Sequence, residues 1–267
     1  MRLALISQKL WEELEPLVPA AKPSPKGGRP RLDDRAAFNG ILFILMTGIP
    51  WEELPQELGF GSGMTCWRRL RQWQRQGVWD RLHQALLCRL RQYDQVDWSR
   101  ASIDGASVAS PPGGQETGPN PTDRGKLGSK RHILTDARGV PLAILVSGAN
   151  RHDSMLFEEL LDAVPPVAGL QGRPRKCPDK VYADKGYDYA KCRRALRQRG
   201  IQARIARRGM HSSQRLGRHR WVVERTHAWL AGFGKLRIRF ERQLDTHLAL
   251  LKLACAIICL RCVERFC

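Results

Sequence analysis

The sequence predicts a mixed α/β domain preceded by a small all-helical domain, and the pattern of apolar residues is what predicts it. Residues 7–95 have apolar positions at helical spacing. From residue 96 onward, β-branched and small residues alternate as in strands, and strand and helix patterns then follow one another. The order is strand, hairpin, helix, strand, helix, strand, helix, which is typical of a mixed sheet with helices on both faces. We therefore expect two domains, at 1–95 and 96–267.

The first domain is predicted to be a series of short helices separated by turns. A Ser at its start, Gly at two helix ends and Pro at the breaks give the boundaries. A basic, glycine-rich hinge is expected at 22–31. The helices are expected at 7–19, 33–48, 49–59 and 64–93, the last interrupted at Gly77.

One of these helices, from Trp67 to Arg75, is strongly basic. Several short helices with one basic helix resemble a helix-turn-helix unit, in which a helix enters the major groove of DNA. The residues expected to contact DNA there are Arg68, Arg69 and Arg71. The alternative is an amphipathic bundle helix with a solvated arginine face, whose tryptophans pack against other helices.

The second domain is predicted from strand and helix patterns separated by Gly/Pro-rich segments. Residues 111–128 read as a long surface loop or flap, and 129–150 as a hairpin with its turn at Asp136–Gly139. Strands are expected at 96–110, 180–184 and 201–207, and helices at 153–164, 189–199, 218–233 and 245–262.

The charge of the chain points to a polyanionic partner. Its 45 Lys and Arg against 26 Asp and Glu give a formal net charge of +19. Nucleic acid is the commonest partner of such a protein, the alternative being a merely basic or ribosome-associated one. We find no apolar run of the roughly 18–20 residues that a membrane span needs, and no signal peptide. We therefore expect no membrane partner.

The cysteines predict a reducing compartment. Eight of them without an export signal suggest free thiols in a cytosol. Cys255, Cys259 and Cys262 are spaced as on one helix within an apolar run, so we expect them in the core. A zinc site is the alternative.

Three carboxylates stand out by their context. Asp104 lies inside the strand pattern ASIDGAS, Asp184 ends the strand of VYADKGYD, and Glu224 lies in the helix pattern RWVVERTHAWL. Half-buried carboxylates are costly unless they are paired or bind a cation. If the two strands are neighbours, both aspartates project at one end of the sheet and Glu224 completes the cluster from a covering helix.

Such a cluster suits two hard divalent cations. Three oxygen donors fit Mg²⁺ or Mn²⁺, and a pair of these ions supports phosphodiester chemistry. Basic residues flank the carboxylates: Lys185 follows Asp184, while Arg220 and Arg225 surround Glu224. Lys130, after the Gly/Pro-rich loop, is expected to meet a phosphate backbone or to lie on a solvated basic surface.

Other acids and two histidines in this half have structural explanations. Asp136 fits a hairpin turn, Asp153 a helix cap, and Asp188 a cap of the next helix. His132 and His152 are expected to be hydrogen-bonding histidines and not metal ligands.

The segments IDGASV, YADKGYD and RWVVERTHAWL together resemble the DDE transposases of bacterial insertion sequences, in the group around insertion sequence five. GRPRLDDRAAFNGILFILMTGIPWEELPQELG, GPNPTDRGKLGSKRHILTD and GVPLAILVSGANRHD extend the resemblance over about residues 10–255, in the order of the family. The resemblance implies a ribonuclease-H-like catalytic domain. It also implies two divalent cations and cut-and-join chemistry at the ends of a mobile element. Asp104, Asp184 and Glu224 match the catalytic triad.

The resemblance further implies element terminal inverted repeats and target DNA as partners, a homo-oligomeric synaptic complex, and work in the bacterial cytoplasm at the nucleoid. The family's longer signature around the glutamate is only partly present: Arg220 matches, but Gly217 and Ala231 replace a Tyr and a Lys. Lys235, one turn further on, could substitute for that Lys. A nuclease that cuts without joining, and a DNA-binding regulator or inactive derivative acting through residues 1–95, remain alternatives.

Overall fold

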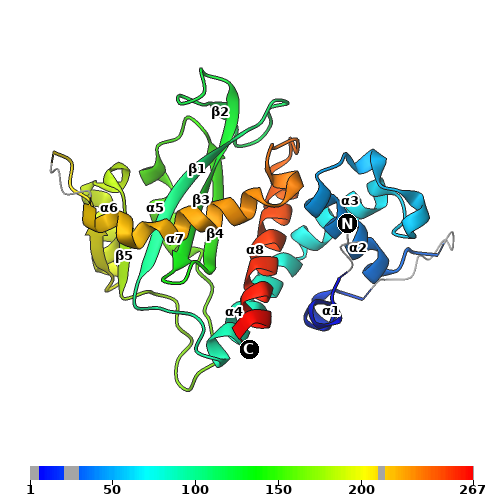
Figure 1. Ribbon diagram of the computed structural model, residues 1–267, viewed down its shortest axis with the longest axis horizontal. Helices are drawn as coiled ribbons and strands as arrows, with labels where there is room; N and C mark the ends of the chain where they lie inside the picture. The colour runs from blue at the N-terminus through cyan, green and yellow to red at the C-terminus, as the bar shows by residue number, and fades with distance from the viewer. Residues whose placement is uncertain (1–5, 21–29, 210–213, 267) are drawn as a thin grey trace.

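The computed structural model describes residues 6–20, 30–209 and 214–266. A group of N-terminal helices lies on one side and a sheet flanked by helices on the other, with the long helix α8 (Leu244–Phe266) between them (Figure 1). The fold is mixed α/β, as predicted. The expected hinge at 22–31 lies almost entirely outside the described residues.

The N-terminal helices begin and end where capping residues occur. Asp33 and Ser62 each accept a hydrogen bond from a backbone N–H in the first turn of the helix that follows. Gly77, with φ 70°, separates the two helices predicted within 64–93. Pro55 divides the segment predicted as one short helix at 49–59 into two 3₁₀ turns. The elements are α1 (Gln8–Leu14), η1 (Glu15–Leu17), α2 (Asp34–Thr47), η2 (Trp51–Glu53), η3 (Gln56–Leu58), α3 (Gly63–Arg75) and α4 (Val78–Gln92).

The sheet has a mixed topology. β1 (Ala101–Ala109) pairs antiparallel with β3 (Leu127–Asp136) on one edge and parallel with β5 (Lys180–Ala183) on the other. β5 pairs parallel with β6 (Gln202–Ile205), and β3 pairs on its outer edge with β2 (Gly118–Pro119) and β4 (Pro141–Gly148). Because β5 is short, it pairs only with the first residues of β1, and the rest of β1 extends past it.

Helices cover both faces of this sheet. α7 (Gln214–Ala231) crosses β1, β3 and β5 on one face, while α5 (Phe157–Asp162) packs against β3 and β4. The predicted helix at 153–164 is shorter than expected, because its first turn is the 3₁₀ segment η4 (Asp153–Met155). The remaining elements are η5 (Lys185–Tyr187), α6 (Ala190–Gln198) and η6 (Gly234–Leu236).

Helix α8 joins the two halves of the molecule. It packs against α3 and α4 from the N-terminal half and against β4 and α7 from the sheet half, and the buried apolar residues form one continuous core. Cys255 and Cys259 are buried free thiols within it, and burial raises the pKa of Cys255 to about 12. Their prediction as core residues is confirmed.

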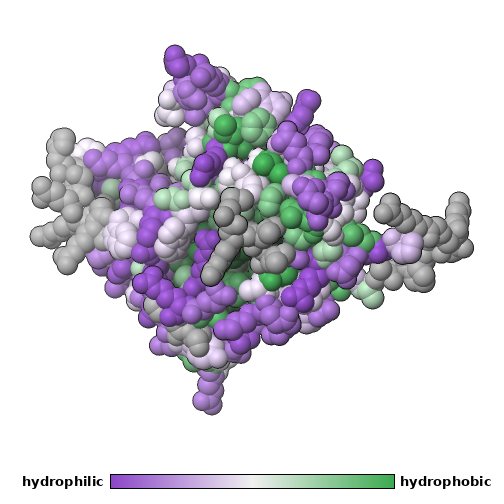
Figure 2. All heavy atoms as spheres, turned by 45° about the vertical axis from the view of Figure 1, so that its right-hand side comes forward, coloured by the Kyte–Doolittle hydropathy of each residue, from purple (hydrophilic) through white to green (hydrophobic). Residues whose placement is uncertain are grey.

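The apolar length of α8 was underestimated from the sequence. Leu244–Arg265 is long and apolar enough to cross a membrane, but most of it is buried inside the fold, as in the core helix of a soluble protein. Figure 2 shows a mostly hydrophilic face with scattered hydrophobic areas. The helix is therefore weak evidence for a span.

Candidate active site

The register of the two parallel strands brings Asp104 and Asp184 to the same place. Ser102 on β1 pairs with Tyr182 on β5, so the aspartates, two residues further along each chain, lie at the same level. Ser102 donates a hydrogen bond to the backbone oxygen of His219 on α7, 3.1 Å away, and the Tyr182 ring packs against the His219 ring. Side chains two residues apart in a strand share a face. Both aspartates therefore project towards α7.

Asp104 is partly buried and electrostatically strained. The pKa of its carboxyl is raised to about 6, mainly by burial; the Arg220 guanidinium opposes this shift, and the nearby carboxylates of Asp184 and Asp153 contribute to it. Arg220 Nη2 lies 3.4 Å from Asp104 Oδ1. A carboxylate held among other carboxylates with one arginine partner favours the approach of additional positive charge.

Asp184 is fixed by the turn that follows its strand. Its Oδ1 accepts a hydrogen bond of 2.8 Å from the backbone N–H of Gly186, at the start of η5. This contact holds the carboxylate at the end of β5, where the sequence places it. The neighbouring Lys185 is exposed beside it.

Glu224 lies apart from the two aspartates. On α7, Arg220, Val223 and His227 face the sheet, whereas Glu224, one turn beyond Arg220, is exposed. Within the described ranges, no three His, Cys, Asp or Glu side chains come together as a set that could hold a metal ion. The structure thus brings Asp104 and Asp184 together. It leaves Glu224, the third predicted carboxylate, on the exposed side of α7.

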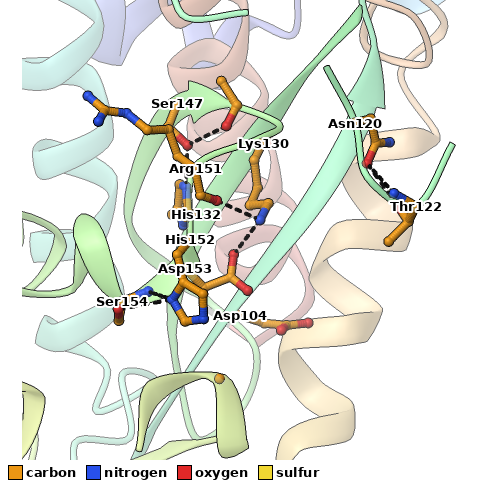
Figure 3. Close-up of polar contacts among 12 residues, drawn as sticks. Asp104, Asn120, Thr122, Lys130, His132, Ser147, Arg151, His152, Asp153 and Ser154 are labelled. Atoms are coloured by element: carbon orange, nitrogen blue, oxygen red, sulfur yellow. Dashed lines mark hydrogen bonds and ion pairs between the residues drawn. The ribbon is translucent and has the colours of Figure 1, made fainter. Parts of the chain in front are cut away.

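A third aspartate, Asp153, lies beside the pair instead. It was predicted to cap a helix, but that prediction is wrong: His152 accepts the hydrogen bond from Ser154 N, and Asp153 reaches back to Lys130. Figure 3 shows Lys130 between the Arg151 backbone oxygen and the Asp153 carboxylate, at 2.9 Å from each, with Asp104 close by.

The buried tyrosine Tyr187 was also missed by the sequence reasoning. Its hydroxyl is enclosed and has no hydrogen-bond partner, and burial followed by the charges of Asp153, Asp104 and Asp184 raises its pKa well above the usual value. The only signal for it in the sequence was its place three residues after Asp184.

The remaining acids and histidines in question are structural. The carboxylate of Asp136 accepts hydrogen bonds from two backbone N–H groups of the hairpin turn, as predicted, and from a third at Asp97, before β1. Asp188 does not cap α6; it pairs with Arg193 and accepts a bond from Arg208 N. His132 hydrogen-bonds Ser147 at 2.8 Å, which confirms its hydrogen-bonding role and that of His152.

The arginines predicted to contact DNA from α3 differ in their availability. Arg68 is exposed. Arg69 is buried, paired with Asp34 and stacked over the Trp73 ring, so its placement is that of a packing residue. Arg71 is half-buried, stacks on the Trp67 ring and pairs with Asp245 of α8 at 3.0 Å. Trp73 and Trp79 are fully buried, which confirms helix packing.

The basic residues predicted near Glu224 also differ in whether they are accessible to DNA. Lys235 is buried over the Trp51 ring. Its Nζ lies 3.7 Å from Glu241 Oε1 and donates a hydrogen bond to the Ile49 backbone oxygen, so the ammonium group is not accessible to a DNA phosphate. Arg225 lies between the Trp221 and Trp229 rings and donates to the Arg138 backbone oxygen.

Arg225 lines a cavity of about 540 Å³ formed by α7, α8 and the β3–β4 turn. The cavity is on the side of α7 away from Arg220 and Asp104, because residues five apart on a helix point in widely different directions. It is therefore separate from the carboxylates, and of the two arginines predicted beside Glu224, Arg220 is the one that lies at the candidate site.

Two family profiles of transposases match the chain. The profile of the family described as "Transposase DDE domain" matches residues 96–259, and that of "Putative transposase of IS4/5 family" matches residues 6–83. Similar proteins include the putative transposase for insertion sequence element IS402 of Burkholderia cepacia. It is 55% identical over 153 residues, which are 57% of this chain and 72% of that protein.

Two further relatives are more partial. An uncharacterized 16.2 kDa protein of insertion element IS402, also from Burkholderia cepacia, is 50% identical over 45% of this chain and 84% of that protein. The transposase for insertion sequence element IS1106 of Neisseria meningitidis serogroup B is 29% identical over 48% of this chain and 42% of that protein. Because the DDE profile covers more than half of the chain, this protein belongs to the DDE transposase family of insertion sequences.

Proposed function

We propose that this transposase cuts DNA at the ends of an insertion sequence and joins the freed 3′-hydroxyl to target DNA. Asp104, Asp184 and Glu224 are the proposed catalytic carboxylates. The observation that supports this most directly is the register of β1 and β5, which gives Asp104 and Asp184 the same level and the same face of the sheet. Two such carboxylates beside one arginine fit the chemistry that the family name describes.

The side chains at this point suit divalent cations. Asp104 and Asp184 offer hard oxygen donors, which Mg²⁺ and Mn²⁺ prefer. The buried hydroxyl of Tyr187, which has no hydrogen-bond partner, is a further oxygen close enough to feel the charges of Asp104, Asp184 and Asp153. We propose that the two aspartates hold two cations and that Glu224 reaches them from α7 when DNA is bound. Bound there, the cations supply charge neutralisation at the reacting phosphate.

The protein's own residues have separable tasks in the two steps. In the first, water hydrolyses a phosphodiester at the element end and releases a 3′-hydroxyl. In the second, that hydroxyl attacks a phosphodiester of the target and displaces its 3′-oxygen. Arg220 orients the Asp104 carboxylate, and Lys185, exposed beside Asp184, is proposed to contact the DNA backbone.

The rest of the molecule is proposed to hold the DNA. Transposases act on DNA, so DNA is the partner. We propose that residues 1–95 recognise the terminal inverted repeats, that residues 96–267 perform the chemistry, and that the protein acts as a homo-oligomer at the bacterial nucleoid. The exposed Arg68 supports a DNA-binding role for the first part, and the net charge of +19 over the whole chain supports DNA binding by the molecule.

A strand-transfer assay tests this proposal. The substrate is labelled DNA that carries the sequences flanking the coding region, with a plasmid target and Mg²⁺ or Mn²⁺. We expect Asp104→Asn, Asp184→Asn and Glu224→Gln each to reduce joining by at least about 100-fold. The matched control is Asp162→Asn, an exposed surface aspartate paired with Arg199, which should join normally. Full-rate joining by Asp184→Asn would refute the assigned role.

The same assay separates the transposase from a simple nuclease. Cleaved ends that never appear attached to the plasmid would show a cutting enzyme without transfer. DNA binding by the wild type, with no cleavage under any cation, would favour a regulator or an inactive derivative.

A further inference from the structure

The carboxylate of Asp153 lies where a side chain at position 105 of β1 would otherwise be. Position 105 of that strand is glycine, and a Cβ built there would lie only 2.7 Å from Asp153 Oδ1. Any other residue at 105 would therefore force the carboxylate away. Asp104 and Gly105 are consecutive, so their side chains point to opposite faces of the sheet. Asp153 thus approaches the site from the face opposite to α7, at the point where β1 extends past β5.

A second glycine gives the distance between Asp153 and Asp184. A Cβ built on Gly186 would lie 2.9 Å from Asp184 Oδ1 and 3.8 Å from Asp153 Oδ2, which places these two oxygens within 6.7 Å of each other. Carboxylate oxygens within this distance can bind the same hydrated cation through its waters, although the described aspartates do not form a closed set of direct ligands.

The hydroxyl of Tyr187 provides an independent observation. Only 1% of this residue is exposed, its hydroxyl has no hydrogen-bond partner, and the charges acting on it are those of Asp153, Asp104 and Asp184. A buried hydroxyl normally has a partner. Because it donates to none of the nearby carboxylates, there is room beside it for a further group, such as a hydrated cation.

The balance of charge around the three aspartates is negative. Arg220 compensates Asp104 at 3.4 Å, and Lys130 compensates Asp153 at 2.9 Å. His132, near Asp153, is neutral at pH 7 because burial lowers its pKa to about 4. The carboxylate of Asp184 receives a backbone N–H bond from Gly186, and its neighbour Lys185 points to solvent. Three negative groups thus have two close cationic partners.

We propose that Asp153 is a further carboxylate of the divalent-cation site, and that the Lys130 ammonium competes with the cation for it. The proposal rests on the proposed function, because the site it extends is that of Asp104 and Asp184. It assigns the Asp153–Lys130 pair a role that a surface ion pair does not have: the lysine weakens cation binding, and the aspartate strengthens it.

Binding of Mn²⁺ alone to the full chain without DNA tests this directly. Free Mn²⁺ is measured by electron paramagnetic resonance during titration, and circular dichroism checks that each variant is folded. We expect Asp153→Asn, which keeps the shape of the side chain, to weaken Mn²⁺ binding by about tenfold or more. Lys130→Gln should strengthen it by several-fold, since it removes the competing charge. Asp162→Asn should leave it unchanged.

Asp153→Asn and Lys130→Gln are expected to have opposite effects on Mn²⁺ binding, so a general loss of structure cannot imitate the expected result. A purely structural pair would give the same loss in both variants, and that result would overturn the proposal, as would unchanged binding in Asp153→Asn. Asp184→Asn shows whether a failure concerns Asp153 alone or the proposed cation site as a whole. If it abolishes Mn²⁺ binding while Asp153→Asn does not affect it, only this inference fails; if neither matters, the proposed cation site fails as well.

Discussion

Replacement of Gly105 by alanine tests the packing of the site, because the added methyl would collide with one carboxylate. The built Cβ lies 2.7 Å from Asp153 Oδ1 and 3.2 Å from the Lys130 Cδ. Non-bonded heavy atoms are comfortable at about 3.5 Å, so the carboxylate must retreat by roughly 0.8 Å. The Lys130–Asp153 contact of 2.9 Å would then be strained or lost.

The expected cost follows from two opposing effects. Overpacking of this kind costs about 1–3 kcal/mol. Gly→Ala in an ordinary strand conformation returns about 0.4–1 kcal/mol, because the unfolded chain loses freedom. The positive-φ glycines of the chain do not include Gly105, so its backbone adds no strain of its own. We therefore expect Gly105→Ala to lower the free energy of unfolding by about 1–2 kcal/mol.

A double-mutant cycle with Asp153→Ala isolates the collision. Urea unfolding of the wild type, both single variants and the double variant gives the four free energies. In the Asp153→Ala background the methyl has room, so Gly105→Ala should become neutral or slightly stabilising. Cation binding should stay weak in the double variant, because the carboxylate is gone. An equal cost of Gly105→Ala in both backgrounds would refute the reasoning.

Two other predictions concern the buried histidines and the basic helix α3. Burial lowers the pKa of four imidazoles below the unfolded value of about 6.5, so they bind fewer protons in the folded chain. Their stability contribution is complete above pH 6.5 and is lost as the pH falls towards 4. The raised pKa values of Asp104 and Asp136 act in the opposite direction, because these two carboxyls bind more protons in the folded chain. Two groups offset only part of the effect of four histidines. Metal-free urea midpoints should therefore fall between pH 6.5 and 4, by up to about 1.4 kcal/mol per pH unit for each net proton, and a flat profile would contradict this. The histidines are His83, His132, His227 and His247. On α3, Arg68→Ala should weaken DNA binding and reduce the salt slope by about 0.9, with unchanged stability. Arg69→Ala should instead destabilise the fold by roughly 1–3 kcal/mol, because it removes a buried side chain that pairs with Asp34 and packs over the Trp73 ring. Equal effects of the two variants on DNA affinity would contradict their different burial.

The fold was predictable where local signals were strong. The helices at 33–48 and 64–93 had caps or glycines at their ends, and the hairpin at 129–150 had a turn aspartate, Asp136, whose three backbone partners the structure contains. The segment at 49–59 was less predictable, because Pro55 interrupts a helical pattern that otherwise continues. The packing of α8 between the two halves is a long-range property that no local pattern reports.

The candidate site was predictable only in part, for a related reason. Asp104 and Asp184 could be paired because a carboxylate inside one strand and another at the end of a neighbouring strand must meet if the strands are parallel. Asp153 looked like a helix cap, since an acid before a helical pattern usually is one. Its actual position depends on Gly105, 48 residues earlier in the chain, because the absence of a side chain there leaves room for the Asp153 carboxylate. Lys235 looked available for DNA because burial of an ammonium over Trp51 leaves no trace in sequence spacing.

The unequal lengths of β1 and β5 explain why the carboxylates gather at this point. β1 has nine residues and β5 has four, and they pair only through Ala101 and Ser102. Beyond that level the chain of β5 turns away through η5, so this edge of β1 from Asp104 onward is left without a neighbouring strand. Backbone and side chains there can be approached from both faces of the sheet: by α7 with Arg220 on one side, and by Asp153 with Lys130 on the other. A longer β5 would continue the pairing past the level of Asp104 and close the space that Asp153 enters. The early end of β5 is therefore the structural cause of this cluster, and the turn at Gly186, whose N–H group holds the Asp184 carboxylate, lies where that end falls.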